Sequence, residues 1–379
     1  MRQVLFEIPL PFTDAKLPLF SFGVMLLISF IVGFWITSRL AKKEGIDPNV
    51  FFDIMLWLFI GGLVGARVMS MVLEAGPGDF SHQLLQFFKI WEGGMVFYGC
   101  IPGVLVAYYF VYKRLIKPKG LRFLQLADLA APAIGLGLFF GRIGCLLNGC
   151  CYGEVAVPGG LPDWQTLKFP GNSSPHMHMV HRGLQTAFGF MLAEEGLPPQ
   201  YLAGDPRTVM LVEPGTAPAL AGLKPGDRIL AVDGQATATV RDVEKQLILH
   251  PVGQPVKLSV LRTAGQTVDL SFLQPTSLPL QPTQIYSSFD GLLLFFLLYT
   301  FYPFRRREGA VMALLMIAHG VSRFHLEQLR SDNPEFWAGM TVSQWISIGL
   351  LVMGLVMMWI VQKKGHLPQP LVSEPAKSA

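Results

Sequence analysis

Arginines at three places interrupt otherwise apolar segments of this chain, and their side chains are the first candidates for chemistry. Arg67 lies in GGLVGARVMSMVL, Arg142 in GRIGCLLNGCCYGE and Arg323 in HGVSRFHLEQLR. A charged side chain at the centre of a bilayer costs about 2.5–3.5 kcal/mol on insertion scales, so three of them require a reason. A guanidinium donates several hydrogen bonds in a planar array that fits a phosphate group. We therefore expect a site for an anionic group, such as the phosphodiester of a phospholipid.

Two simpler explanations of the arginines stay open at this stage. The arginines pair with Glu92 and Glu327 as structural ion pairs, or they extend from helix ends to the membrane surface. Glycines near them either let helices pack closely, which is the commoner role, or leave a groove wide enough for a lipid. These glycines are Gly61, Gly62, Gly65, Gly93, Gly94, Gly99, Gly135, Gly137, Gly141 and Gly144.

The segments that carry the arginines are apolar runs long enough to cross a membrane. Of the 379 residues, 51% are hydrophobic and only 15% are charged, which is far less charge than a soluble protein of this size carries. About 20 apolar residues cross the hydrocarbon core as a helix. The sequence therefore predicts an all-α polytopic membrane protein with seven transmembrane helices, at 17–38, 50–74, 93–112, 123–147, 285–303, 309–326 and 339–362.

Basic residues follow alternate helices, and this pattern predicts the orientation. They cluster after the first, third, fifth and last apolar runs, so the positive-inside rule places those loops in the cytoplasm. The amino terminus is then periplasmic, the carboxyl terminus is cytoplasmic, and the three arginines fall in the outer halves of their helices. Met1 to Lys16 lacks the order of a signal peptide, so we expect the first helix to be retained. The small net charge of +4 argues against a nucleic-acid partner.

The segment between the fourth and fifth helices differs from the rest because it is rich in proline, glycine and charge. This change in composition divides the chain into four predicted regions. They are transmembrane helices one to four at 1–147, a periplasmic head segment at 148–200, a β-rich domain at 201–275, and helices five to seven with a cytoplasmic tail at 276–379. Within the third region, VMLVEPGTAPALAGLKPGDRILAVDGQ resembles a bacterial PDZ domain. Such domains bind an extended peptide at a sheet edge. We place the carboxylate-binding loop near Leu202 to Arg207; the alternative is a domain that serves only as a spacer.

Several motifs along the membrane part agree, in order and spacing, with one family. GGLVGAR, WEGGMVFYG, GRIGCLLNG, PTQIY, SRFHLEQLRSD and MTVSQW resemble the bacterial prolipoprotein diacylglyceryl transferases. The resemblance implies an enzyme of the inner membrane that moves the diacylglyceryl group of phosphatidylglycerol to the lipobox cysteine of a prolipoprotein and releases glycerol phosphate. It implies no metal and no organic cofactor.

The resemblance also implies roles for individual residues of this chain. Arg142 and Arg323 match two arginines of the family, and we expect both to be catalytic together with Tyr98. The expected substrate-binding residues are Arg67, Asn148, Gln284, Tyr286, Glu327, Arg330, Glu92, Gly141 and Gly144.

The sequence departs from the family pattern at several of these positions. Tyr98 stands where the family has a histidine that assists proton handling, and a tyrosine, with a reference pKa of about 10, is a poor base at neutral pH unless neighbouring cations depress that pKa. Phe22 replaces a tyrosine, Cys145 an asparagine, Cys150 an acidic residue and Gln281 a histidine. Three other functions therefore stay open: a phospholipid-dependent transferase with a different acceptor, a catalytically degenerate fold that anchors a peptide-binding domain, and a periplasmic thiol oxidoreductase.

All four cysteines of the chain, Cys100, Cys145, Cys150 and Cys151, are predicted to lie near the outer leaflet. An oxidising compartment favours one or two disulfides. The alternatives are reduced thiols that pack in the core, a metal site, against which the spacing C-x4-C-C counts, and thiol chemistry on the enzyme itself. In a variant of the family motif, GR-x-G-C-x3-G-C-C-[YF]-G, the cysteines mark a subgroup and do not exclude transferase activity.

Three histidines lie close together in PHMHMVHRG, namely His176, His178 and His181. Their spacing suits a zinc or copper site, but neither a carboxylate nor a cysteine accompanies them at ligand spacing. We expect no metal there, and a solvated loop or short helix instead.

Overall fold

The structure is a computed structural model that describes residues 4–9, 16–74, 99–156, 162, 165–193 and 205–367. The chain forms two compact units. The insertion unit consists of residues 148–283 and 329–332, and the bundle unit consists of the rest of the described chain. We describe each unit by itself.

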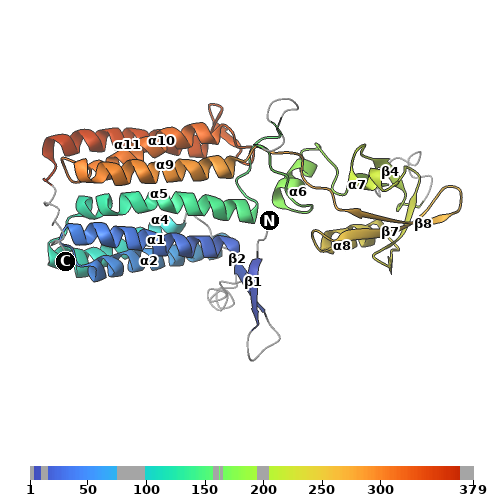
Figure 1. The fold of residues 1–379 in the computed structure, drawn as a ribbon, viewed down its shortest axis with the longest axis horizontal. Helices are drawn as coiled ribbons and strands as arrows, with labels where there is room; N and C mark the ends of the chain where they lie inside the picture. Colours follow the sequence, from blue (N-terminus) through green and yellow to red (C-terminus); the bar gives the residue numbers. More distant parts are fainter. Residues whose placement is uncertain are drawn as a thin grey trace, which may run out of the picture. The chain divides into compact units, whose positions relative to one another are not determined.

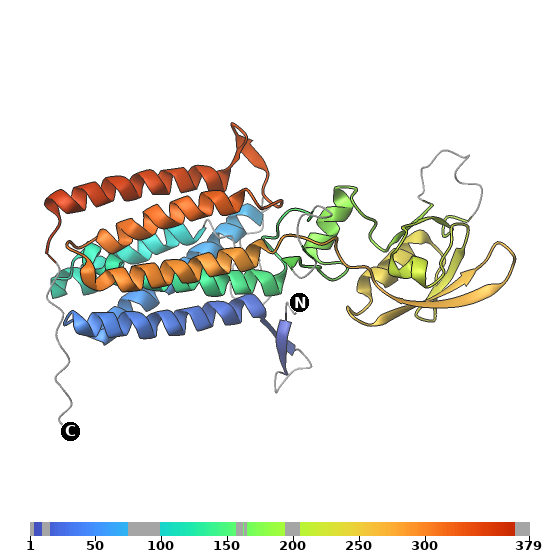
Figure 2. The ribbon, with the colours of Figure 1, turned by 45° about the horizontal axis from the view of Figure 1, so that its top comes forward.

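Long apolar helices make up the bundle unit, and they lie side by side in Figures 1 and 2. Their apolar residues run around most of each helix surface, as expected for helices that face lipid on one side and each other on the other side. The helices are α1 (Ser21–Lys43), α2 (Pro48–Glu74), α4 (Cys100–Val111), α5 (Phe123–Asn148), α9 (Thr283–Phe301), α10 (Ala310–Glu327) and α11 (Val342–Lys364).

Five of these helices, α1, α2, α5, α9 and α11, are long and apolar enough to cross a membrane. This confirms a polytopic membrane protein. The third and sixth predicted spans overlap α4, which has 12 residues, and the 18-residue α10, which carries two histidines besides Arg323 and Glu327. Neither is among the five, so a bundle of seven spans stays a proposal.

Shorter elements flank the helices. The first apolar run was predicted as a helix from residue 17, but α1 begins only at Ser21, after an antiparallel hairpin of β1 (Val4–Pro9) and β2 (Lys16–Phe20). A π-helical turn (Tyr112–Ile116) and a 3-10 turn (Lys117–Lys119) extend α4, and a further 3-10 turn (Tyr302–Phe304) follows α9. The strands β9 (Glu335–Trp337) and β10 (Met340–Thr341) pair before α11.

Glycines bring the helices of the bundle into backbone contact. A Cβ atom added to Gly65 of α2 would overlap the carbonyl oxygen of Gly99, and one on Gly103 of α4 would overlap that of Gly61. Small residues at helix interfaces allow this close approach in membranes. Gly61, Gly65 and Gly99 therefore serve first as packing surfaces.

A second glycine contact joins α5 to α9. A Cβ atom on Gly135 would lie 2.8 Å from the backbone nitrogen of Phe295, and one on Gly291 would lie 2.6 Å from that of Phe139. The hydroxyl of Ser288 donates to the carbonyl oxygen of Phe139 at 3.2 Å. The two helices that carry Arg142 and Asp290 are thus fixed against each other over several turns.

Buried polar side chains connect α1, α5 and the start of α10 at one end of the bundle. The buried Arg305 guanidinium pairs with Glu44 and lies 3.5 Å from Asp128. Tyr302 donates to the same Glu44 carboxylate, and Asp128 accepts the backbone N–H groups of Gly309 at 2.7 Å and Met312 at 2.9 Å. Since buried charges are tolerated only when paired and hydrogen-bonded, this network holds segments from both halves of the sequence together.

An antiparallel sheet forms the centre of the insertion unit, with strand order β6-β5-β7-β8. Two short strands, β3 and β4, form a separate antiparallel pair, and α8 begins with a capping box of Thr239 and Asp242. The elements are α6 (Ser174–His181), β3 (Phe190–Leu192), β4 (Val209–Val212), α7 (Ala217–Leu220), β5 (Arg228–Val232), β6 (Gln235–Ala236), α8 (Val240–Leu249), β7 (Pro255–Leu261) and β8 (Thr267–Leu273).

The core of this domain includes residues that precede the predicted boundary at 201. Phe190 of β3 is buried in one cluster with Val209, Val243 and Leu247. Residues 194–204, between β3 and β4, lie outside the described part of the chain. We propose that the domain begins near residue 186.

The chain enters and leaves this domain at neighbouring points. The side-chain oxygen of Gln185 accepts the backbone N–H of Leu278 at 2.7 Å, and its side-chain nitrogen donates to the carbonyl oxygen of Thr276 at 3.5 Å. The two ends of the inserted domain are therefore joined to each other by hydrogen bonds.

We predict that Gly65→Ala loosens or separates the α2–α4 pair, because the added methyl group meets the rigid backbone of α4. The expected loss is about 1–3 kcal/mol of bundle stability, measured by thermal unfolding in detergent micelles. Gly23→Ala on α1 is the matched control, since no described atom lies within 4 Å of its added Cβ. Equal unfolding temperatures for the two variants would contradict this packing.

Candidate functional site

Arg142 of α5 and Arg323 of α10 approach the same acidic side chain. Asp290 of α9 lies within electrostatic range of both guanidinium groups. The Ser322 hydroxyl donates to the Asp290 carboxylate at 3.0 Å. Three helices from distant parts of the sequence therefore bring two cations and one anion into one cluster, which we call the arginine cluster: Arg142, Asp290, Ser322 and Arg323.

Glu327 holds Arg323 in place within this cluster. The two side chains, one turn apart on α10, form an ion pair with 2.6 Å between Nη2 and Oε2, and the Glu327 side chain is fully buried. Its other oxygen accepts hydrogen bonds from Asn333 and, at 3.2 Å, from Thr341. Ser343 of α11 lies 3.3 Å from Arg323. Ion pairing, one of the two simpler explanations, thus describes Arg323 and Glu327, and the acid fixes the direction of the guanidinium.

A small cavity of about 130 Å³ lies beside Arg142, between α5 and α9. Gln284, which is buried, and Ser288 supply the other polar side chains of its wall, and the rest is apolar. At about 30 Å³ for each molecule of liquid water, the volume corresponds to about four waters, so it suits a phosphate-sized group and is too small for acyl chains.

A larger cavity of about 810 Å³ lies between α2 and α4, away from the arginine cluster. Its wall is almost wholly apolar, and Arg114 is the charged residue in it. Because it lacks polar side chains that could act on a reacting bond, we do not assign the chemistry to it.

The remaining predicted residues of the bundle unit occupy separate positions. Arg67 is buried in α2, and its convergence with the other arginines stays a prediction. A Cβ atom on Gly144 would meet Phe22 of α1 at 2.9 Å, whereas one on Gly141 would meet nothing within 4 Å. Tyr286 lies on α9, one helical turn before Asp290, and so shares its face. Tyr98, Glu92, Gly93 and Gly94 lie outside the described residues.

Arg330 and Asn148 belong to the insertion unit. Arg330 forms two hydrogen bonds with the carboxylate of Asp332, at 3.0 and 3.1 Å. The segment is anchored to the head segment, because Ser331 donates to the carbonyl oxygen of Gly153 at 3.0 Å. A role for Arg330 in the same site as Arg142 and Arg323 remains a prediction.

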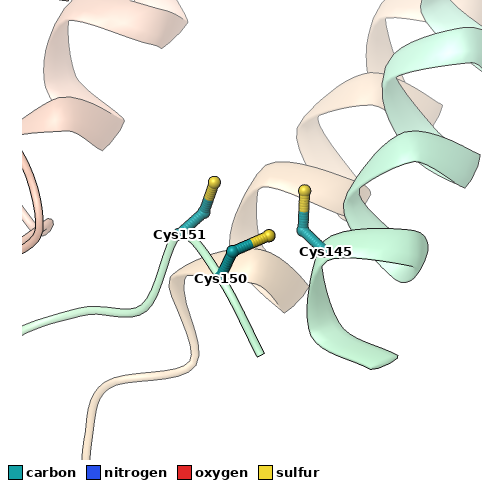
Figure 3. A group of neighbouring side chains, drawn as sticks. All are labelled: Cys145, Cys150 and Cys151. Atoms are coloured by element: carbon teal, nitrogen blue, oxygen red, sulfur yellow. The ribbon is translucent and has the colours of Figure 1, made fainter. Parts of the chain in front are cut away.

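Three of the four cysteines fall within seven residues of sequence at the end of α5 (Figure 3). Cys145 lies in the last turns of the helix, and Cys150 and Cys151 follow it. Cys151 adopts a left-handed backbone with φ of 59°, and the Asn148 side chain lies 3.9 Å from the Cys150 sulfur. All four cysteines are half-buried thiols in this structure, and the predicted disulfides remain a prediction for the oxidised protein.

The three neighbouring histidines lie in a short helix, α6, as expected, but His176 is fully buried and not solvated. Burial lowers the pKa of His176, and its Nδ1 accepts the backbone N–H of Asn172 at 3.2 Å. The His178 ring lies 5.7 Å from that of Tyr152. Packing and local hydrogen bonding therefore explain the positions of two of the three histidines, His176 and His178.

Sequence reasoning missed Asp290 and His319. His319, one turn before Arg323 on α10, lies within electrostatic range of both arginines. Their positions in the sequence could have indicated them. Each is a titratable residue inside an apolar run, and such a residue is a candidate for a functional site by default.

We predict that Glu327→Gln lowers bundle stability by about 3 kcal/mol, since breaking a buried pair leaves the guanidinium without its acid. Unfolding in detergent micelles measures this loss. Glu335→Gln in the exposed strand β9 is the control and is expected to match the unaltered protein; a similar loss in both would show that the Arg323–Glu327 pair contributes nothing.

Comparison with known proteins identifies the family. The family model described as prolipoprotein diacylglyceryl transferase matches residues 9–360. Three relatives carry the name phosphatidylglycerol–prolipoprotein diacylglyceryl transferase. The protein of Rhodopirellula baltica is 28% identical over 90% of this chain and 72% of its own length. Those of Proteus mirabilis and Burkholderia cenocepacia are 25% and 26% identical over 95% and 90% of this chain, and 94% and 91% of their own lengths.

Among solved structures, one titled "HtrA-type protease AlgW with decapeptide" is 27% identical and covers 27% of this chain and 33% of that chain, with a TM-score of 0.19, which is too low to establish a shared fold. The sequence and family comparisons confirm the transferase predicted from the motifs. The match across nearly all of the sequence shows that this chain belongs to the prolipoprotein diacylglyceryl transferase family.

Proposed function

We propose that this protein transfers the diacylglyceryl group of phosphatidylglycerol to the thiol of a prolipoprotein lipobox cysteine and releases glycerol phosphate. The observation that carries the proposal is the arginine cluster, where two guanidinium groups from α5 and α10 lie within electrostatic range of one carboxylate, and Arg142 lines a phosphate-sized cavity. Family membership supports the same reaction.

The chemistry explains why cations are needed in an apolar bundle. A thiolate attacks the glycerol carbon of the diacylglyceryl group, and the phosphate ester leaves with the electrons of the broken C–O bond. Negative charge grows on the leaving oxygen, so guanidinium groups already fixed beside it lower the barrier. Arg142 lines the cavity, and Arg323 is held in one orientation by Glu327.

The membrane arrangement belongs to the same proposal. Seven helices span a bacterial inner membrane, with the amino terminus in the periplasm and the carboxyl terminus in the cytoplasm. The alternation of basic loops supports this orientation. The arginine cluster then lies toward the outer leaflet, where phosphatidylglycerol and the acceptor meet.

The inserted domain recruits the acceptor polypeptide as a PDZ-like module. Strand β3 supports this role, because among the described strands it pairs with β4 alone. Gly189, just before β3, has a left-handed φ of 79°, and its carbonyl oxygen accepts the N–H of Glu213 on the β4 side. Backbone groups alternate along a strand, so those of Phe190 face the opposite edge, where an extended peptide can pair.

The carboxylate-binding loop fits this edge better than the position near Leu202 to Arg207. Arg207 pairs with Asp205 and donates to the carbonyl oxygen of Thr237. Its guanidinium lowers the pKa of Asp205 to about 2. Residues 201–204 lie outside the described chain. The loop at 186–189 leads directly into β3 and is the better candidate.

We predict that Arg142→Ala and Arg323→Ala reduce glycerol phosphate release from phosphatidylglycerol by about 10²-fold or more, as loss of a charge-stabilising donor does in other enzymes. The assay uses the full chain in vesicles with a lipobox peptide, and complementation of a strain that lacks its own transferase tests it in cells. Arg114→Ala, in the large apolar cavity, is the control and should leave the activity unchanged.

Other outcomes of the same assay distinguish the competing functions. Release with other thiols or alcohols but not with the lipobox peptide points to a different acceptor. Peptide binding without release points to a degenerate anchor, and thiol exchange without release points to an oxidoreductase. Full activity of both arginine variants would remove the arginine cluster from the reaction.

We predict that replacing residues 187–275 by a short Gly-Ser linker raises the KM for a full-length prolipoprotein several-fold and leaves the KM for a short lipobox peptide unchanged. The adjacency of Gln185 and Leu278 makes this deletion feasible. An equal effect on both acceptors, or on neither, would show that the domain does not recruit the acceptor.

A further inference from the structure

The proposed reaction needs a group that accepts the thiol proton, and the imidazole of His319 lies near the arginine cluster. His319 lies on α10, three residues before Ser322 and four before Arg323, so all three occupy one face of the helix. Arg142 and Arg323 both lie within electrostatic range of its ring. The Ser322 hydroxyl, one turn after His319, lies 3.0 Å from the Asp290 carboxylate.

The hydrogen bonding of His319 leaves it available as a base. Its Nδ1 atom is buried and has no hydrogen-bond partner among the described residues. His325, on the same helix, differs: its Nδ1 contacts the carbonyl oxygen of Val321 at 2.9 Å, and its side chain is exposed. Since a buried ring nitrogen without a partner is costly, the Nδ1 atom of His319 is expected to gain a partner in the complex with substrates.

We propose that His319 is the general base that accepts the proton of the acceptor thiol, an inference that rests on the proposed transferase function. Among the described side chains near the cluster, His319 is suited to this task, because a neutral imidazole has a lone pair on one ring nitrogen that can accept a proton, whereas the Asp290 carboxylate already accepts the Ser322 hydroxyl. Tyr98 would first have to lose its own proton.

The step balances without any further reactant. The thiol proton moves to the imidazole, the sulfur forms a bond to the glycerol carbon, and the C–O bond to the phosphate breaks with its electron pair on the phosphate oxygen. The imidazolium then gives the proton to the released glycerol phosphate. His319 is neutral again at the end of the cycle.

The test compares two acceptors, a lipobox peptide with cysteine and the same peptide with selenocysteine. A selenol is largely ionised at neutral pH and needs no base. For His319→Gln we expect transfer to cysteine to fall by about 10²–10⁴-fold, as for the loss of a general base, and transfer to selenocysteine to fall far less. The ratio of the two rates, measured on one preparation, is insensitive to the fraction of folded protein.

Two control variants separate base catalysis from other effects. His325→Gln is expected to keep both rates, and Arg142→Lys is expected to slow both acceptors alike and keep the ratio of the unaltered enzyme. An unchanged ratio in His319→Gln, whether both rates fall or neither does, would overturn the assignment of the base. Absence of transfer by the unaltered chain would instead overturn the proposed function.

Discussion

A guanidinium inside an apolar bundle must be paired with a carboxylate to offset the cost of burying its charge, and the rest of the structure depends on this pairing. Arg323 meets Glu327, whose second oxygen is taken by Asn333 and Thr341, while Asp290 lies near Arg323 and Arg142 together. The two cations are thus stabilised by neighbouring acids. An incoming phosphodiester therefore enters a cluster in which the charges of Asp290 and Glu327 nearly balance those of the two arginines.

Close packing makes this arrangement rigid. The contact between Gly135 and Gly291 fixes α5 against α9, which are the helices of Arg142 and Asp290, and Gly320 lets α10 lie directly on the backbone of α11 near Ser347. Each charge is therefore carried by a helix whose neighbour cannot shift without a backbone clash. Electrostatic stabilisation of a leaving group depends on such prior positioning.

Much of the fold could be predicted because membrane helices are recognised in a sequence by the length of their apolar runs. The bounds of α2, α5, α9 and α11 lie within a few residues of the apolar runs, whereas the hairpin before α1 and strand β3 were missed, since strands of three to six residues leave little periodicity. The site was only partly predictable. The motifs pointed to Arg142 and Arg323, but the roles of Asp290 and His319 depend on which helices touch, and no local pattern contains that information.

The buried network around Arg305 has a consequence for the continuity of the chain. It joins Glu44 and Asp128, from the sequence before the insertion, to Arg305 and Gly309 after it, and the glycine contact of α5 with α9 adds a second link across the same divide. A single cut by a protease in the insertion therefore leaves the two fragments associated within the bilayer. The same property makes the protein suitable for expression as two separate polypeptides that reassemble.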